Sequence, residues 1–260
     1  MSKATLQTVF HQGFAAYAQA HHLPAFIHKA ARNIMHCRTA ALGGHVQACP
    51  AGHFERNHYN SCRHRACPQC AYIQVQKWLA RQSERLLATD HYHVIFTIPH
   101  ELNPLWRYNT KLLTNLLFSC ASDTISELLQ DPKYLGAKVG IIASLHTWSK
   151  TIILHPHVHC LVTGGGLRDG QWIKLRRDYL FPFAVASKLF KGKLLAHLSQ
   201  ALKDGQLTVP NNMNAAALKK LLHQLWRKKW NVKIQDKYTH GQGVITYLAR
   251  YLRGGPIANS

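Results

Sequence analysis

Five of the seven cysteines of this chain fall between residues 37 and 70, where no helical or strand periodicity is visible. Cys, His, Gly, Arg and Asn fill this segment, so it lacks the apolar residues needed for a core of its own. Clustered thiols of this kind are typical of a small domain held together by a metal ion. The alternative is that the thiols are buried or incidental. We expect a metal-stapled module at this point of the chain.

The segment Cys67-Pro-Gln-Cys70 has the spacing of one half of a tetrahedral zinc site, because a tight turn places both sulfurs on one side. Cys49 and His53 are the expected other half, and 13 residues separate His53 from Cys67. Cys62 competes for a place in this set. A weaker second site would use Cys37, His45 and His64. All these ligand sets are saturated, so we expect structural zinc.

The charge balance of the chain points to a polyanionic partner. Its 32 Lys and Arg stand against 11 Asp and Glu, which gives a formal net charge of +21. Nucleic acid is the usual partner of such a chain, and an anionic membrane is the competing one. No apolar run reaches the length of a membrane span, and the N-terminus lacks a signal-peptide core. We therefore expect a cytoplasmic, DNA-binding protein with reduced cysteines.

Hydrophobic periodicity predicts an α+β chain with a mainly antiparallel sheet. Helices are expected over residues 1–36 with a break at Pro24, and over 72–89, 105–129, 184–203, 214–229 and 244–252. Strands are expected over 91–98, 139–150 and 152–162, the last ended by three glycines at 164–166. The expected organisation is N-terminal helices (1–36), a zinc-binding module (37–76), a connecting helix (77–90) and one further domain (91–260).

Three histidines alternate in the predicted strand HPHVHCLV, at positions 155, 157 and 159. Alternate side chains of a strand share one face, so two of these imidazoles can bind one metal ion. Pro156 favours His157 and His159 over His155, and His146 on the preceding strand is the inferred third ligand. Imidazoles with open water positions suit Mn, Mg, Zn or Ni, and ligand type alone favours a transition metal. For a nuclease we expect Mg²⁺ or Mn²⁺, which would polarise a phosphate oxygen. The alternative is a surface strand in a chain that has 19 histidines.

Tyr247 and Tyr251 lie four residues apart in VITYLARYLRGG and would share one face of a helix. Arg250 and Arg253 flank them and are expected to hold phosphates. A phenol can attack a phosphodiester and conserve the bond as a phosphotyrosine. The alternative is a helix stripe that only packs in a core.

Residues 219–230 form a basic segment in which Lys228 and Lys229 are expected DNA contacts. Exposed tryptophans close to such a segment can stack on bases of a single strand. The candidates are Trp148, Trp172, Trp226 and Trp230, and the alternative for each is a place in the core.

Five motifs occur in one order along the chain: YNSCRHRACPQC, HVIFTIP, SLHTWSK, HPHVH and YLARYLRGG. Together they resemble the two-tyrosine, HUH-type rolling-circle transposases of bacterial insertion sequences, which carry a zinc-binding N-terminal domain. Each motif alone has modest specificity, whereas the ordered set covers roughly residues 30–256.

The resemblance implies that residues 91–260 are an HUH nuclease domain, an antiparallel sheet flanked by helices, with its His-x-His pair on a middle strand. His157 and His159 match that pair, and Tyr247 and Tyr251 match the nucleophiles, which would form a 5′-phosphotyrosine with single-stranded DNA. Members of the family usually continue well past the tyrosine helix, so we expect a copy truncated at its C-terminal end. A plasmid replication initiator or relaxase shares this chemistry, and a non-catalytic DNA-binding remnant is the alternative from another class.

Overall fold

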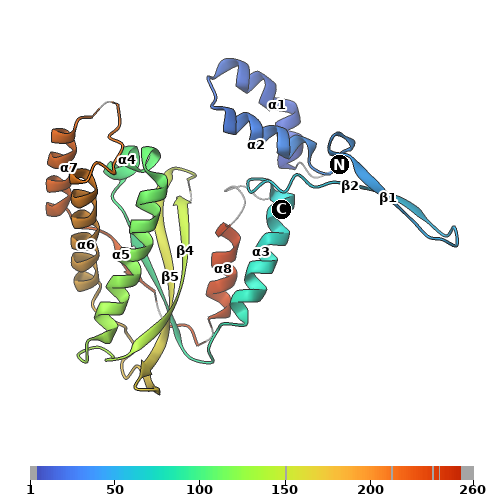
Figure 1. Ribbon diagram of the computed structural model, residues 1–260. Coiled ribbons are helices and arrows are strands. Elements are labelled where there is room, and N and C mark those ends of the chain that lie inside the picture. Colours follow the sequence, from blue (N-terminus) through green and yellow to red (C-terminus); the bar gives the residue numbers. More distant parts are fainter. Residues whose placement is uncertain (1–4, 150, 212, 236, 240, 253–260) are drawn as a thin grey trace. The chain divides into compact units, whose positions relative to one another are not determined.

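The computed structural model describes residues 5–252 apart from 150, 212, 236 and 240 (Figure 1). The chain divides into two compact units. The first unit comprises residues 1–84 together with 249–260, and the second comprises residues 85–248. The four segments expected from the sequence stay a prediction, and the unit boundary at residues 84 and 85 falls within the expected connecting helix (77–90). Each unit is described by itself below.

Two helices, α1 (Leu6–Ala20) and α2 (Ala25–His36), begin the first unit. The Thr5 hydroxyl caps α1 by accepting from the Thr8 amide. Pro24 separates the helices, as the sequence predicts, and takes the N-cap position of α2. The Gln7 side-chain amide donates to the carbonyls of Met35 and Cys37, at 2.7 and 2.9 Å. These bonds hold α1 against the C-terminal end of α2.

A short 3₁₀ turn, η1 (Ala40–Leu42), leads from α2 into a two-stranded hairpin of β1 (Gly44–Ala48) and β2 (Glu55–Tyr59). Nearly every residue of the hairpin is exposed, so it contributes little to a core. The chain then passes through Cys62 to α3 (Pro68–Ser83). Cys67 takes the N-cap position of α3, and Pro68 starts the helix where its missing N–H costs nothing.

The second unit is built on a five-stranded antiparallel sheet in the order β4-β5-β3-β7, with β6 paired to β5. The strands are β3 (His91–Thr97), β4 (Lys138–Trp148), β5 (Leu154–Arg168), β6 (Gln171–Lys174) and β7 (Val232–Ile234). The long strand β5 therefore lies between β4 and β3, as the resemblance implies for the strand that carries the His-x-His pair.

One face of this sheet is covered by helices (Figure 1). The helices of the unit are η2 (His100–Leu102), α4 (Asn103–Tyr108), α5 (Thr110–Gln130), α6 (Phe183–Lys203), α7 (Ala215–Arg227) and the start of α8 (Gln242–Leu252). Alternate strand residues such as Val94, Phe96, Val158 and Cys160 are fully buried in a core shared with α5, α6 and α7. The intervening residues face the opposite side of the sheet, which we call the histidine face.

Strand β5 continues through the three glycines that were expected to end it, reaching Arg168. The reason is close packing between strands rather than a turn. A Cβ at Gly165 would lie 2.7 Å from the Ile173 carbonyl oxygen, and one at Gly166 would lie 2.6 Å from that of Lys138. Only glycine allows β4 and β6 to pair so tightly with this end of β5.

The predicted α+β class is confirmed: an antiparallel sheet is flanked by helices, and a cluster of four cysteines lies in the N-terminal unit. The expected helix over 105–129 is divided into α4 and α5, since Asn109 interrupts it. Strands β6 and β7 were not predicted. Among the described residues, none of the helices combines the length and apolarity that crossing a membrane requires.

Candidate metal centres

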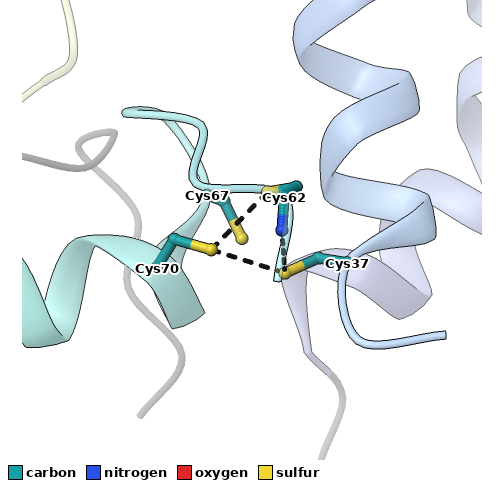
Figure 2. Close-up of side chains that lie close together, drawn as sticks. All are labelled: Cys37, Cys62, Cys67 and Cys70. Carbon is teal, nitrogen blue, oxygen red and sulfur yellow. Dashed lines mark hydrogen bonds between the residues drawn. The ribbon is translucent and has the colours of Figure 1, made fainter. Parts of the chain in front are cut away.

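Four thiols meet in the first unit, from Cys37, Cys62, Cys67 and Cys70 (Figure 2). Cys37 follows α2, Cys62 follows the hairpin, and Cys67 and Cys70 lie at the start of α3. All four sulfurs lie within 4.8 Å of one another. Ile34 is buried with them, and Leu6 and Phe10 of α1 pack against the group.

The arrangement fits a tetrahedral zinc ion. The Cys37 and Cys70 sulfurs are 3.5 Å apart, and those of Cys62 and Cys70 are 3.6 Å apart. Zinc–sulfur bonds of about 2.3 Å in a tetrahedron place sulfurs roughly 3.8 Å from one another. Four sulfurs fill the coordination sphere, so the site is structural and has no position left for substrate.

Backbone amides donate hydrogen bonds to two of these sulfurs, and the chain turns sharply after both of these cysteines. Arg38 and Arg63, which follow Cys37 and Cys62, have left-handed backbones with φ of 59° and 52°. The Cys62 amide donates to the Cys37 sulfur at 3.5 Å, and the His64 amide donates to the Cys62 sulfur at 3.4 Å. Such bonds stabilise the thiolates that a zinc ion requires. Burial raises the pKa of the Cys37 thiol to about 11, and it also raises that of Cys62, so metal binding must displace protons.

The structure does not bring Cys49 and His53 to this cluster, so the ligand set expected from the sequence needs correction. Both lie at the turn end of the hairpin, where Cys49 Sγ is 3.7 Å from His53 Nδ1 and the Cys49 amide donates to the Phe54 carbonyl. Five residues of strand span about 16 Å and separate this turn from the end of the hairpin next to Cys37 and Cys62. Cys37 takes the fourth place instead, and His45 and His64 are not ligands of the cluster.

A second group lies on the histidine face, where His146 of β4 meets His157 and His159 of β5. His146 is in register with His157 across the strand pair, and one ligand nitrogen of each of the three lies within 4.8 Å of the others. The ring centroids of His146 and His159 are 4.0 Å apart. The three residues inferred from the sequence are therefore together, whereas His155 does not belong to the set.

The three imidazoles are held in the neutral form, which is the form that binds a metal. Burial, followed by the neighbouring histidines, lowers the pKa of His146 to about 3 and that of His159 to about 2. Burial also lowers the pKa of His157. Neutral imidazoles packed this closely fit a divalent cation, which would use their lone pairs. His157 Nδ1 lies 2.5 Å from the His155 carbonyl, so that nitrogen is the donor and Nε2 has the lone pair.

Two further residues of this site are missed by sequence reasoning. His93 of β3 stacks on His159, with ring centroids 4.9 Å apart, and Gln235 follows β7 and binds His93. His93 carries a usable signal, because it alternates with core residues in HYHVIFTI and must share a face with other histidines once the strands pair. Gln235 carries none, since β7 has only three residues.

Tyr247 and Tyr251 both fall on α8, as predicted, but their side chains and that of Arg250 lie outside the described residues, as does the whole of Arg253. The start of α8 lies at the histidine face. A Cβ on Gly241, the residue before the helix, would approach Cγ of His91 to 3.1 Å. Glycine therefore lets the chain enter α8 directly against the strand that carries His91 and His93.

The expected DNA contacts lie at the C-terminal end of α7. Lys228 forms an ion pair with Glu101, which reduces its availability for phosphate, whereas Lys229 is exposed. Trp230 is buried and Trp226 is 55% exposed, so only Trp226 of this pair can stack on a base. Trp226 borders a groove of about 480 Å³ between α6 and α7, whose lining includes Lys203 and Lys219. The Lys191 ammonium lies 5.6 Å from the centre of its ring.

Comparison with known proteins matches two separate stretches of the chain to two family models. A family model described as "Transposase zinc-binding domain" matches residues 9–98, which include all four clustered cysteines. A model described as "Putative transposase" matches residues 140–260, which include the three histidines of the second group and the helix with both tyrosines.

Two curated relatives match most of the chain. "Putative transposase y4qJ" of Sinorhizobium fredii is 37% identical over 230 residues, covering 86% of this chain and 58% of the relative. "Transposase for insertion sequence element IS801" of Pseudomonas savastanoi pv. phaseolicola is 31% identical over 241 residues, covering 86% of this chain and 54% of the relative. The chain thus spans a little over half the length of these relatives. Because both family models and both relatives agree, the chain belongs to the family of insertion-sequence transposases that carry an N-terminal zinc-binding domain.

Proposed function

We propose that this chain supplies the chemistry by which an insertion sequence is moved: it nicks and rejoins single-stranded DNA with tyrosine nucleophiles and a histidine-bound divalent metal. The observation that carries the proposal is the convergence of His146, His157 and His159 on one face of the sheet. The zinc-binding domain match favours a transposase over a plasmid replication initiator or relaxase.

Three neutral imidazoles would hold Mg²⁺ or Mn²⁺ and leave other coordination positions for oxygen atoms. When bound, such an ion polarises a phosphate oxygen and offsets the charge that builds up at phosphorus. The three histidines of the sheet contribute by fixing the position of the metal site. Paired strands hold the three imidazoles rigidly, and a phosphate bound through the metal would therefore keep one position relative to the start of α8, which follows Gly241.

Tyr247 and Tyr251 are the proposed nucleophiles. A phenol oxygen attacks phosphorus, the bond from phosphorus to the 3′ oxygen breaks, and that oxygen becomes a 3′-hydroxyl with the proton that the phenol gives up. The product is a 5′-phosphotyrosine that conserves the bond energy. A 3′-hydroxyl from another strand reverses the step, reforms the phosphodiester and restores the phenol. Two tyrosines allow two such transfers.

End-labelled DNA tests this polarity. Single-stranded oligonucleotides from the ends of the element are incubated with the protein and Mn²⁺, then separated on a denaturing gel. A 3′ label should move with the protein, whereas a 5′ label should appear on a shorter free strand that a polymerase can extend. If the 5′ label moves with the protein, the phosphotyrosine assignment is wrong.

Tyr247→Phe and Tyr251→Phe identify the attacking residue, and Tyr179→Phe is the matched control because Tyr179 is an exposed tyrosine elsewhere in the second unit. The adduct should survive in the control and be lost in the double Tyr247→Phe, Tyr251→Phe variant. Binding of end sequences without an adduct under any metal would favour a non-catalytic DNA-binding protein.

A further inference from the structure

Behind the three metal-ligand candidates, a line of hydrogen bonds crosses the histidine face from β7 to β5. The Tyr238 hydroxyl donates to Gln235 Oε1 at 2.8 Å. The same oxygen lies 3.0 Å from Nδ1 of His93. Nε2 of His93 lies 2.7 Å from Nδ1 of His159.

The chemistry of these atoms fixes the direction of each bond. An amide oxygen only accepts, so Nδ1 of His93 must carry the proton of that bond. A neutral imidazole has one N–H, so Nε2 of His93 is an acceptor and Nδ1 of His159 is the donor. By the same rule, Nε2 of His159 has the lone pair. Both rings are almost fully buried, which favours their neutral forms.

From this geometry we infer that His93, oriented by Gln235, is a positioning residue that keeps the His159 proton on Nδ1 and thereby offers Nε2 to the metal. The inference rests on the proposed function, in which His159 is a ligand. It adds His93 and Gln235 to the site as residues that act through His159 and touch neither metal nor DNA.

His157 is arranged in the same way by a different group. Its Nδ1 donates to the His155 carbonyl. This backbone oxygen keeps the His157 proton on Nδ1, as His93 does for His159. Both histidines of the His-x-His pair are thus set to bind through Nε2. Groups that fix the tautomer of a metal ligand typically contribute 10–100-fold to metal affinity.

A purely structural role for His93 predicts something different. The ring is 2% exposed and would then be needed only for its volume. His93→Met fills the space with an apolar side chain of similar length but removes the acceptor nitrogen, Nε2. His93→Gln places an amide oxygen where it can accept the proton of His159 Nδ1. The two variants separate packing from hydrogen bonding.

The first measurement is the tautomer of His159 in protein without a metal in this site, read from long-range ¹H–¹⁵N NMR spectra and assigned with His159→Gln. Wild type and His93→Gln should show a proton on Nδ1. His93→Met should show a proton on Nε2 or a mixture. A His159 proton that stays on Nδ1 in His93→Met would overturn the inference.

The second measurement is Mn²⁺ affinity by calorimetry. We expect His93→Met to bind about 10–100-fold more weakly and His93→Gln to bind within a few-fold of wild type. If His93→Met does not fold, Gln235→Met leaves the ring in place and should still shift the His159 tautomer. Wild type that binds no Mn²⁺ would overturn the proposed function, whereas the tautomer measurement decides the role of His93 by itself.

Discussion

Cys37 Sγ lies 3.5 Å from Cys70 Sγ, although the two residues are 33 positions apart. This contact joins the end of α2 to the first turn of α3 and makes Cys37, not Cys49, the fourth member of the thiol cluster. We predict that Cys37→Ser loses stoichiometric zinc and lowers the melting temperature of the first unit, because an open coordination position replaces a thiolate.

Cys49→Ser is the matched control, since Cys49 lies at the hairpin turn and outside the cluster. It should retain one zinc ion per chain by elemental analysis. Loss of zinc from Cys49→Ser with full retention in Cys37→Ser would restore the ligand set expected from the sequence.

A strong chelator should unfold the first unit and spare the second. The first unit has only a small buried cluster around the four thiols, whereas the second has an extensive apolar core. Without the ion, so little buried surface cannot offset the loss of chain entropy. Limited proteolysis checks this: cleavage should increase within residues 5–84, while residues 85–248 stay protected. Equal protection of both regions after chelation would count against a zinc-dependent fold.

Substitution of the metal-ligand candidates should abolish Mn²⁺ binding and the DNA adduct together. His146→Gln and His159→Gln each remove one ligand from the group of three. His155→Gln is the control, because His155 is on the same strand but outside the group. We expect at least a 100-fold loss of adduct formation for the first two and little change for His155→Gln. A full loss in the control alone would place the metal elsewhere on the strand.

Acid should destabilise the second unit when no metal occupies the histidine group. The folded-state pKa values of His146 and His159 are lowered to about 3 and about 2, against about 6.5 in an unfolded chain. Below pH 6.5 the unfolded chain therefore binds more protons, so the free energy of unfolding falls as pH falls. Each histidine contributes at most ~1.4 kcal/mol per pH unit in this window.

Thermal melts at pH 7.5 and 5.5 test this, with protein that holds one zinc ion per chain in the thiol cluster and no metal in the histidine group. The melting temperature should drop at the lower pH, and the drop should shrink in the double His146→Gln, His159→Gln variant. A melting temperature that does not change between these pH values would show that the two imidazoles are not held neutral.

Trp226 is expected to stack on a base of a single strand in the groove between α6 and α7. Trp226→Ala should weaken binding of single-stranded DNA by about 1–3 kcal/mol, whereas Trp226→Phe should retain most of it. Fluorescence anisotropy at two salt concentrations separates this stacking from the contribution of the surrounding lysines. Identical affinities for wild type and both variants would mean that Trp226 is an exposed side chain with no part in DNA binding.

Much of the histidine site follows from the sequence because period-two alternation is a local property. His157 and His159 had to share a face of a strand, and a short connection to the preceding strand brought His146 beside them. His93 required knowledge that β3 pairs with β5, which alternation alone does not give. The extension of β5 through Gly165 was missed for the same reason, since the need for glycine there comes from β4 and β6.

The zinc ligands show a different limit. The spacing of Cys67 and Cys70 identifies half of a site, because a single turn sets their separation. The choice among Cys37, Cys49 and Cys62 depends on where the hairpin turn and the end of α2 lie in space. Sequence distance favoured Cys49 and His53, whereas the packing of α1 on α2 places Cys37 beside α3.

Strand β5 sends Val158 and Cys160 into the core and His157 and His159 to the opposite face. Inserting or deleting a single residue within this strand would exchange the two sets, leaving imidazoles among apolar helices and aliphatic groups at the metal site. Fold and chemistry would then be lost in one event. A one-residue insertion or deletion inside β5 is therefore expected to mark a transposase copy that no longer folds, whereas a change of length in the connections at either end of the strand leaves both sets in place.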